Sequence, residues 1–293
     1  MEKGGDYLSF LLYNIFKKGG VLMLTSISEV KTFRECRRKW YFSGRNGMYL
    51  RPKIVDSSFK TGSAFHAALE AMYKQESYNI DNIIDKYKVE EKDRDMLKFQ
   101  IKKYEENVLK HDLETINVIA PEFKYSIELE NGVTLFGFID VVYEEKKTGD
   151  IGALEHKFVR NFRSDVYNYL DEQIKAYELA ILKVFGQCNA GVSLNQVRKL
   201  KTKFGHARET YKQTDEQLSH FYKELLEVTS QMRLLSENGV VDHPAEPHWM
   251  GCSFCEYKSL CLKMNQAGTN DTTILTEKDI ENAGLIKNPR DIL

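Results

Sequence analysis

The hydrophobic pattern of this 293-residue chain changes its period near residue 122, and this change limits the possible folds. Upstream, apolar side chains recur at helical spacing over 28–45, 63–76 and 93–111. Strand-like alternation follows over 122–129, 134–143 and 151–158, with turn signals at Asn131-Gly132 and 147–150. Next come a helix pattern over 166–184, a strand over 190–197 and a helix over 214–235. This order predicts an α/β fold with a central mixed sheet flanked by helices.

Composition and charge place the chain among ordinary globular proteins. It has 42 Lys and Arg against 43 Asp and Glu, a formal net charge of −1, and 42% hydrophobic residues. This balance excludes a globally basic nucleic-acid coat protein but leaves room for a local basic patch. No segment reaches the roughly 18–20 apolar residues of a membrane-spanning helix, and the chain has no signal-peptide pattern. We therefore expect a cytoplasmic protein without a membrane partner.

Three regions are expected along the chain. Residues 1–22 carry a short amphipathic pattern and are predicted to be an N-terminal appendage. Residues 23–264 hold the alternating helix and strand patterns and form the predicted domain. Residues 265–293 are polar and weakly patterned, which is typical of a C-terminal tail.

Two of the predicted strands carry acidic and basic side chains that can meet. One contains Gly137-Phe138-Ile139-Asp140, and the next contains Glu155-His156-Lys157. Alternation places Glu155 and Lys157 on one strand face, and a hairpin brings Asp140 close to them. Two carboxylates at one point form a hard-oxygen site for Mg²⁺ or Mn²⁺, and a neighbouring lysine can orient or deprotonate a water molecule. The alternative is that these are unrelated groups on solvated strand faces.

Three further polar features accompany these strands. His66 and Glu70 share one helix face, as do Gln173 and Tyr177, because each pair is four residues apart. Taken alone, such pairs are common, and a single histidine in a helix is often a packed core residue. Glu122 lies at the start of the first strand. It could contact the metal ligands without binding the metal itself, or it could be a solvated strand end.

In this order and at these spacings, the polar residues resemble the RecB-like branch of the PD-(D/E)XK nuclease superfamily. The family pattern has an early His, a Gly-hydrophobic-hydrophobic-Asp strand, a (D/E)-x-K strand and a Gln-x-x-x-Tyr helix, here His66, Asp140, Glu155, Lys157, Gln173 and Tyr177. The resemblance implies a restriction-endonuclease-like core in which Asp140, Glu155 and His66 hold a divalent metal. It implies that Lys157 serves the attacking water, while Gln173 and Tyr177 support the site or touch DNA. His156 departs from the pattern, but alternation points it away from the metal.

The chain has five cysteines, and an odd number without a secretion signal argues against a disulfide framework. Cys252, Cys255 and Cys261 have the spacing C-x2-C-x5-C, which indicates a metal or cluster site. Cys36 is the candidate for a fourth ligand. Cys188 opens a predicted core strand and is expected to be a buried structural thiol. On these residues alone, zinc and an iron–sulfur cluster both suit four thiolates.

The order of the cysteines is similar to that of the iron–sulfur subgroup of the same nucleases. That subgroup includes AddB-type nuclease domains, RecB-like CRISPR adaptation exonucleases and phage relatives, with one cysteine before the nuclease core and three after it. The resemblance implies a 4Fe–4S cluster bound by Cys36, Cys252, Cys255 and Cys261, which would join the N- and C-terminal helical parts.

Two segments of the chain are strongly basic. Residues 28–53 hold eight basic side chains against two acidic ones, interleaved with aromatic residues, and residues 197–213 hold six against one. Such stretches suit a groove that follows phosphates and stacks bases, although a charge run is often only a solvated face. The residues expected to contact DNA are Arg37, Arg38, Lys39, Tyr41, Lys201 and Lys203.

Together these features predict a metal-dependent deoxyribonuclease, acting as an exonuclease on single-stranded DNA or on DNA ends. One alternative is a DNA-end-binding subunit of a larger repair, recombination or CRISPR adaptation complex, with weak nuclease activity. Another is a structural protein held together by zinc. Protein partners in repair, replication or CRISPR adaptation fit the first two hypotheses.

Overall fold

The computed structural model describes residues 23–237 and 246–288 and divides the chain into two compact units. The first unit comprises Met1–Lys53, Ile127–Phe136 and Lys223–Leu293, and the second comprises Ile54–Ser126 and Gly137–Tyr222. The predicted appendage over residues 1–22 lies outside the described residues. Within the two described stretches, no helix combines the length and the apolar character that crossing a bilayer requires.

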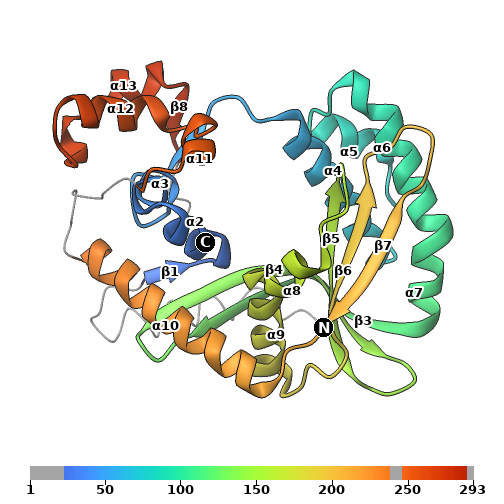
Figure 1. Ribbon diagram of the computed structural model, residues 1–293. Helices are drawn as coiled ribbons and strands as arrows, with labels where there is room; N and C mark the ends of the chain where they lie inside the picture. Colours follow the sequence, from blue (N-terminus) through green and yellow to red (C-terminus); the bar gives the residue numbers. More distant parts are fainter. Residues whose placement is uncertain (1–22, 238–245, 289–293) are drawn as a thin grey trace. The chain divides into compact units, whose positions relative to one another are not determined.

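The second unit is built around the strand β5 (Ile151–Val159), which is buried along most of its length. β4 (Val133–Glu145), in this unit from Gly137 on, pairs antiparallel with β5, and β3 (Ile116–Glu128) pairs with β4. On its other edge, β5 pairs in parallel with β6 (Gly191–Arg198), and β7 (His206–Tyr211) is antiparallel to β6 (Figure 1). The predicted mixed sheet is confirmed.

Helices contact both faces of β5. Phe65 of α4 (Ser57–Tyr73) stacks on Phe158 at 4.4 Å between ring centroids, whereas Gln173 of α9 (Glu172–Phe185) donates a hydrogen bond to Glu155. Because side chains alternate along a strand, positions 155 and 158 point to opposite faces. The remaining helices of the unit are α5 (Ile80–Lys86), α6 (Glu91–Tyr104), the π-helix η1 (Glu105–Leu109), α7 (Lys110–Thr115), α8 (Asp165–Leu170) and the start of α10 (Asp215–Glu237).

Two predicted helices are broken in the structure, and one strand of the second unit has no predicted counterpart. The helix expected over 28–45 is α2 (Ile27–Glu35) followed by α3 (Arg37–Ser43), because Cys36 takes an extended backbone with φ −164° and caps α3. The helix expected over 166–184 breaks in the same way at Asp171, which caps α9. β7 lacks apolar alternation, since Tyr211 is its one buried residue.

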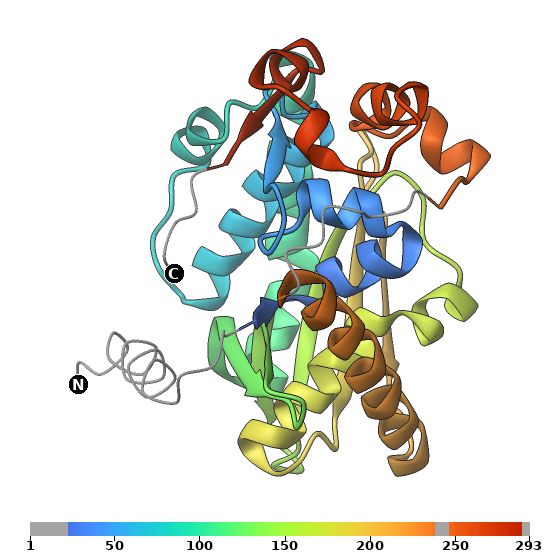
Figure 2. The ribbon, with the colours of Figure 1, turned by 90° about the vertical axis from the view of Figure 1, so that its left-hand side faces the viewer.

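The first unit joins segments from both ends of the described chain. β1 (Met23–Thr25) pairs in parallel with the start of β4, and β2 (Leu50–Pro52) pairs antiparallel with β8 (Leu285–Lys287), a blue strand beside a dark red one in Figure 2. Phe42 and Leu50 share an apolar core with side chains of α12 (Lys258–Gln266) and α13 (Glu277–Asn282). The segment predicted as a C-terminal tail is therefore folded as far as residue 287.

A buried polar network lies on the α4 side of β5. Arg208 of β7 pairs with Asp112 of α7 at 2.6 Å, and the side chain of Asp112 is only 3% exposed. The hydroxyl of Tyr73 also donates to Asp112, and Asn195 donates to the hydroxyl of Tyr104. A buried charge is tolerated only when it is paired and hydrogen-bonded. This network therefore holds α7 against the sheet, through β7.

We predict that Asp112→Ala lowers the free energy of unfolding by about 3–5 kcal/mol, because it leaves the Arg208 charge without its buried partner. The matched control is Asp81→Ala, whose carboxylate pairs with Lys98 at 2.5 Å on the surface, with side chains 60% and 40% exposed. That loss should cost no more than about 1 kcal/mol. Urea unfolding followed by circular dichroism measures both, and equal costs would contradict the prediction.

Candidate functional site

β4 and β5 bring the two predicted carboxylates together in a buried part of the second unit. Glu155 is 3% exposed, and Asp140 accepts a hydrogen bond of 2.6 Å from the backbone N–H of His156. Burial and the negative charge of Asp140 raise the pKa of Glu155 to about 7. Burial also opposes ionisation of Asp140, but His66 and the His156 N–H outweigh it and hold the pKa of Asp140 below its usual range.

His66 and Glu122 complete a cluster around Asp140. The His66 Nδ1 lies 3.2 Å from Asp140 Oδ1, and one ligand atom from each of His66, Glu122 and Asp140 lies within 4.8 Å of the others. Carboxylate oxygens with one imidazole nitrogen are a suitable donor set for Mn²⁺ or Mg²⁺. Burial, together with the charges of Asp140 and Glu70, raises the pKa of Glu122 to about 6.

The position of Glu122 depends on its backbone. Its φ of 47° is left-handed, which is uncommon for a residue other than glycine and costs of order 1–3 kcal/mol. A strand that kept regular alternation would aim this side chain differently. The structure therefore places Glu122 within the candidate ligand group, whereas the sequence left open a solvated strand end or a role outside the ligands.

Lys157, Gln173 and Tyr177 surround Glu155. The Lys157 ammonium contacts Glu155 Oε1 and donates to Gln173 Oε1 at 3.1 Å. The Gln173 amide nitrogen donates to Glu155 Oε1 at 3.1 Å and to the Tyr177 hydroxyl at 2.7 Å, so both ends of this amide are fixed. Burial acts to lower the pKa of Lys157, but the Glu155 charge outweighs it and raises the pKa, which keeps the amine protonated.

Gly137, in the predicted Gly-Phe-Ile-Asp strand, has a steric role. A Cβ atom there would lie 2.5 Å from the Tyr125 hydroxyl oxygen, so a larger residue would displace that ring. Tyr125 is buried and its ring contacts that of Tyr177 at 6.1 Å between centroids. The glycine therefore allows β3 and β4 to approach closely beside the carboxylates.

The site opens into a groove of about 570 Å³ within the second unit. His66, Glu122 and Lys157 line it, together with Phe59 from α4 and Arg163, which follows β5. The ring of His156 lies on the other face of β5 and stacks on Tyr73 at 5.3 Å. This confirms that His156 points away from Glu155 and Lys157.

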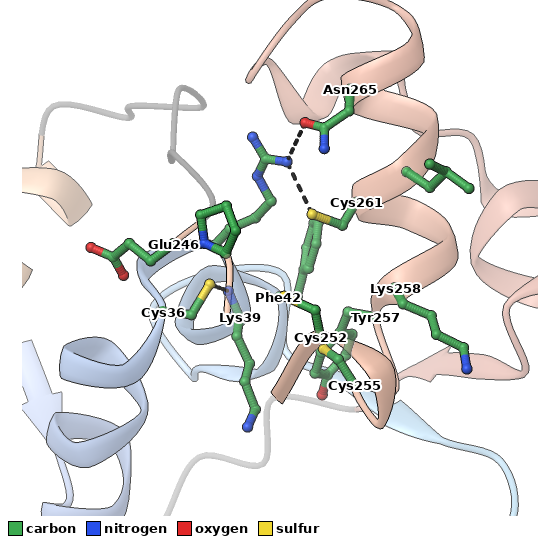
Figure 3. A pocket seen from close by; sticks show the side chains of 13 residues that line it. Cys36, Lys39, Phe42, Glu246, Cys252, Cys255, Tyr257, Lys258, Cys261 and Asn265 are labelled. Carbon is green, nitrogen blue, oxygen red and sulfur yellow. Dashed lines mark hydrogen bonds between the residues drawn. The ribbon is translucent and has the colours of Figure 1, made fainter. Parts of the chain in front are cut away.

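The four predicted cluster cysteines line one pocket of the first unit, about 200 Å³ in volume (Figure 3). Cys36 lies between α2 and α3, whereas Cys252, Cys255 and Cys261 come from α11 (Trp249–Ser253), the turn after it and α12. Cys188 is buried in the second unit, and burial raises the pKa of its thiol to about 12. The structure thus gathers the four cysteines and separates the fifth.

Arg38, predicted to contact DNA, is instead buried beside the cysteine pocket. It is 1% exposed, and its guanidinium donates to Cys261 Sγ at 3.1 Å and to Asn265 Oδ1 at 3.3 Å. Figure 3 draws both bonds, at Cys261 and Asn265. A buried guanidinium cannot reach a DNA phosphate, so this prediction is wrong.

The other predicted DNA contacts have varied surroundings. Lys39 lines the cysteine pocket and pairs with Glu35 at 3.0 Å, and Arg37 lies 3.6 Å from Glu246. Tyr41 packs against the core of the first unit. Lys201 and Lys203 are exposed on the connection between β6 and β7. For these five residues, DNA contact stays a prediction.

We predict that Glu122→Gln weakens Mn²⁺ binding by about 10- to 100-fold, a typical cost of disturbing a metal site. In the metal-free protein, Glu122 gains a proton below about pH 6, and Mn²⁺ must displace that proton. Wild-type affinity should therefore fall as the pH drops through 6, and the variant should lose this part of the dependence. Calorimetric titration measures both, with exposed Glu114→Gln as the control. An unchanged affinity would remove Glu122 from the site.

A crystal structure from Eubacterium rectale, of a protein provisionally described as an exonuclease, shares the fold with a TM-score of 0.54 and 13% identity over 88% of this chain and 92% of that chain. The crystal structure of SSO0001, with 12% identity over 86% and 94%, has a TM-score of 0.34, too low to support an argument. No curated protein shows significant similarity.

The family described as the PD-(D/E)XK nuclease superfamily matches residues 25–262. This match includes the strands that carry Asp140 and Glu155, and it includes all four cysteines of the pocket. The chain therefore belongs to the PD-(D/E)XK nuclease superfamily.

Proposed function

We propose that this protein is a metal-dependent deoxyribonuclease that acts as an exonuclease on single-stranded DNA or on DNA ends, with Mg²⁺ or Mn²⁺. The observation that carries the proposal is the cluster of His66, Glu122 and Asp140 at an open groove, with Lys157 and Glu155 beside it. Superfamily membership supports phosphodiester hydrolysis as the reaction. Repair, replication or CRISPR adaptation would supply the protein partners.

The side chains divide the work of hydrolysis. His66, Asp140 and Glu122 would hold the metal, whereas Glu155, predicted as a ligand, is not in the group of ligand atoms that lie within 4.8 Å of one another. The metal would supply charge neutralisation of the phosphate and acidify a water molecule. The charge of Glu155 raises the pKa of Lys157, so we assign its Nζ as a donor that orients the attacking water or a phosphate oxygen. Gln173, which bonds both Lys157 and Glu155, and Tyr177, which bonds Gln173, are positioning residues.

We also propose that the cysteine pocket holds a 4Fe–4S cluster. A single zinc ion with Zn–S bonds of about 2.3 Å would require sulfur atoms roughly 4 Å apart. Among the described residues, one group of candidate ligands lies within 4.8 Å of one another, and it contains none of these cysteines. The 200 Å³ cavity lined by the four thiols has room for a group larger than one ion. The thiolates of a 4Fe–4S cluster bind separate iron atoms.

We predict that Asp140→Ala, Glu155→Ala and Lys157→Ala each lower the cleavage rate by at least about 10³-fold. The first two weaken the metal site, and the third removes a positive charge beside the phosphate. Lys183→Ala, an exposed lysine further along α9, is the control and should cleave normally. The assay uses end-labelled single- and double-stranded oligonucleotides with Mn²⁺ or Mg²⁺. Near-wild-type rates in any of the first three variants would refute the assigned site.

We predict that Cys36→Ala, Cys252→Ala, Cys255→Ala and Cys261→Ala each lose iron, together with thermal stability. A link between Cys36 and Cys261 closes a long loop, and such a link contributes several kcal/mol, about 4 or more in the entropic model. Cys188→Ala should keep full iron content and cost only about 1 kcal/mol in packing. Iron analysis and absorbance near 400 nm of anaerobic protein provide the measurement. Zinc in place of iron would refute the cluster.

A further inference from the structure

Aromatic side chains are exposed in the groove and on the segment that follows β5. Phe59 of α4 is 68% exposed, and Phe162 and Tyr167, in and after the turn that follows β5, are 41% and 52% exposed. Phe59 and Arg163 line the groove together with Lys157. Large apolar rings in solvent beside an active groove indicate a binding surface.

Arginines are held against two of these rings. The guanidinium of Arg163 lies 5.5 Å from the centroid of Tyr167, and that of Arg198 lies 5.6 Å from the centroid of Phe162. A guanidinium stacked on a ring keeps its N–H groups in its own plane, where they can donate to phosphate oxygens. The Arg198 Nε donates to the carbonyl of Arg160 at 3.2 Å, which also fixes the turn that bears Phe162.

Positive charge is concentrated around these rings. The Lys199 Nζ donates to Ser58 Oγ at 2.6 Å, next to Phe59, and lies 5.3 Å from the ring of Phe158. Burial and the positive charge of Arg160 lower the pKa of Lys199, while the charges of Asp93 and Asp56 act in the opposite direction. Asp171 lies 3.5 Å from Arg163 and compensates part of this charge.

We propose that Phe59, Phe162 and Tyr167, with Arg160, Arg163 and Arg198, form a track that binds a single DNA strand and leads it into the groove. The inference rests on the proposed nuclease function and names the part of its substrate that the track recognises. Phosphates contact the guanidinium groups, and unpaired bases stack on the exposed rings. Bases in a duplex are already stacked on their neighbours, so the track selects single-stranded DNA.

The test separates base contacts from phosphate contacts. Fluorescence anisotropy in EDTA measures binding of a normal single strand, an abasic strand of equal length, the duplex and the equivalent RNA. Phe162→Ala and Tyr167→Ala should each weaken binding of the normal strand by about 5- to 100-fold. They should weaken abasic binding less, because that strand loses only the ring's support of the neighbouring guanidinium. Arg163→Gln should weaken the binding of both the normal and the abasic strand. It should also reduce the slope of log binding constant against log salt concentration by about 0.7.

Matched variants guard against trivial effects. Phe162→Tyr and Tyr167→Phe keep the rings and should bind as the wild type does. Lys183 and Tyr222 form a similar cation–ring contact at 5.6 Å, and Lys183 lies ten residues beyond Gln173, about 15 Å along α9. Lys183→Gln and Tyr222→Ala should therefore leave DNA binding unchanged.

Three outcomes would overturn the track: equal loss of normal and abasic binding in the ring variants, wild-type binding in those variants, or tighter binding of duplex or RNA. Failure of the proposed nuclease is a different result. It would appear as no cleavage of any DNA by the wild-type protein with Mn²⁺, while the binding experiment in EDTA still reports on the track.

Discussion

Electrostatic repulsion between two buried carboxylates is the constraint around which the second unit is organised. Asp140 and Glu155 lie on paired strands, and burial raises the free energy of each charge. His66 and the backbone N–H of His156 keep Asp140 ionised. Lys157 and Gln173 contact Glu155, whose pKa is about 7. A divalent cation would compensate the remaining negative charge, so the polar groups that hold the two carboxylates in place also suit the site to a metal ion.

The other face of β5 has to be rigid for this arrangement to work. The residue between Glu155 and Lys157 is His156, whose ring stacks on Tyr73 and accepts from Asn195 at 2.8 Å. Burial lowers the pKa of His156 to about 3, so the ring is neutral and adds no charge behind the carboxylates. Its backbone N–H bonds Asp140. One residue thus links the buried network to the site, through its ring Nδ1 on one side and its backbone N–H on the other.

Sequence patterns could predict the parts of this protein that depend on regular geometry. Strand alternation and four-residue helix spacing were enough to place Glu155, Lys157, Gln173 and Tyr177 on common faces. Glu122 could not be placed, because its aim depends on a left-handed backbone that no spacing reveals. The break at Cys36 was also hidden, because the helical pattern continues through this residue although it caps α3. The folding of the C-terminal segment was hidden because it depends on contacts between residues far apart in the chain.

Charge density along the sequence was misleading for a related reason. The run around Arg38 suggested a DNA surface, yet Arg38 is buried against Cys261, whereas Arg163, from a less basic segment, lines the groove together with Lys157. Arg163 is six residues beyond Lys157, at most about 20 Å of extended chain. The strand that supplies Glu155 and Lys157 therefore also supplies the start of the proposed track, so any shift of β5 that disturbs catalysis must disturb binding of the DNA strand as well.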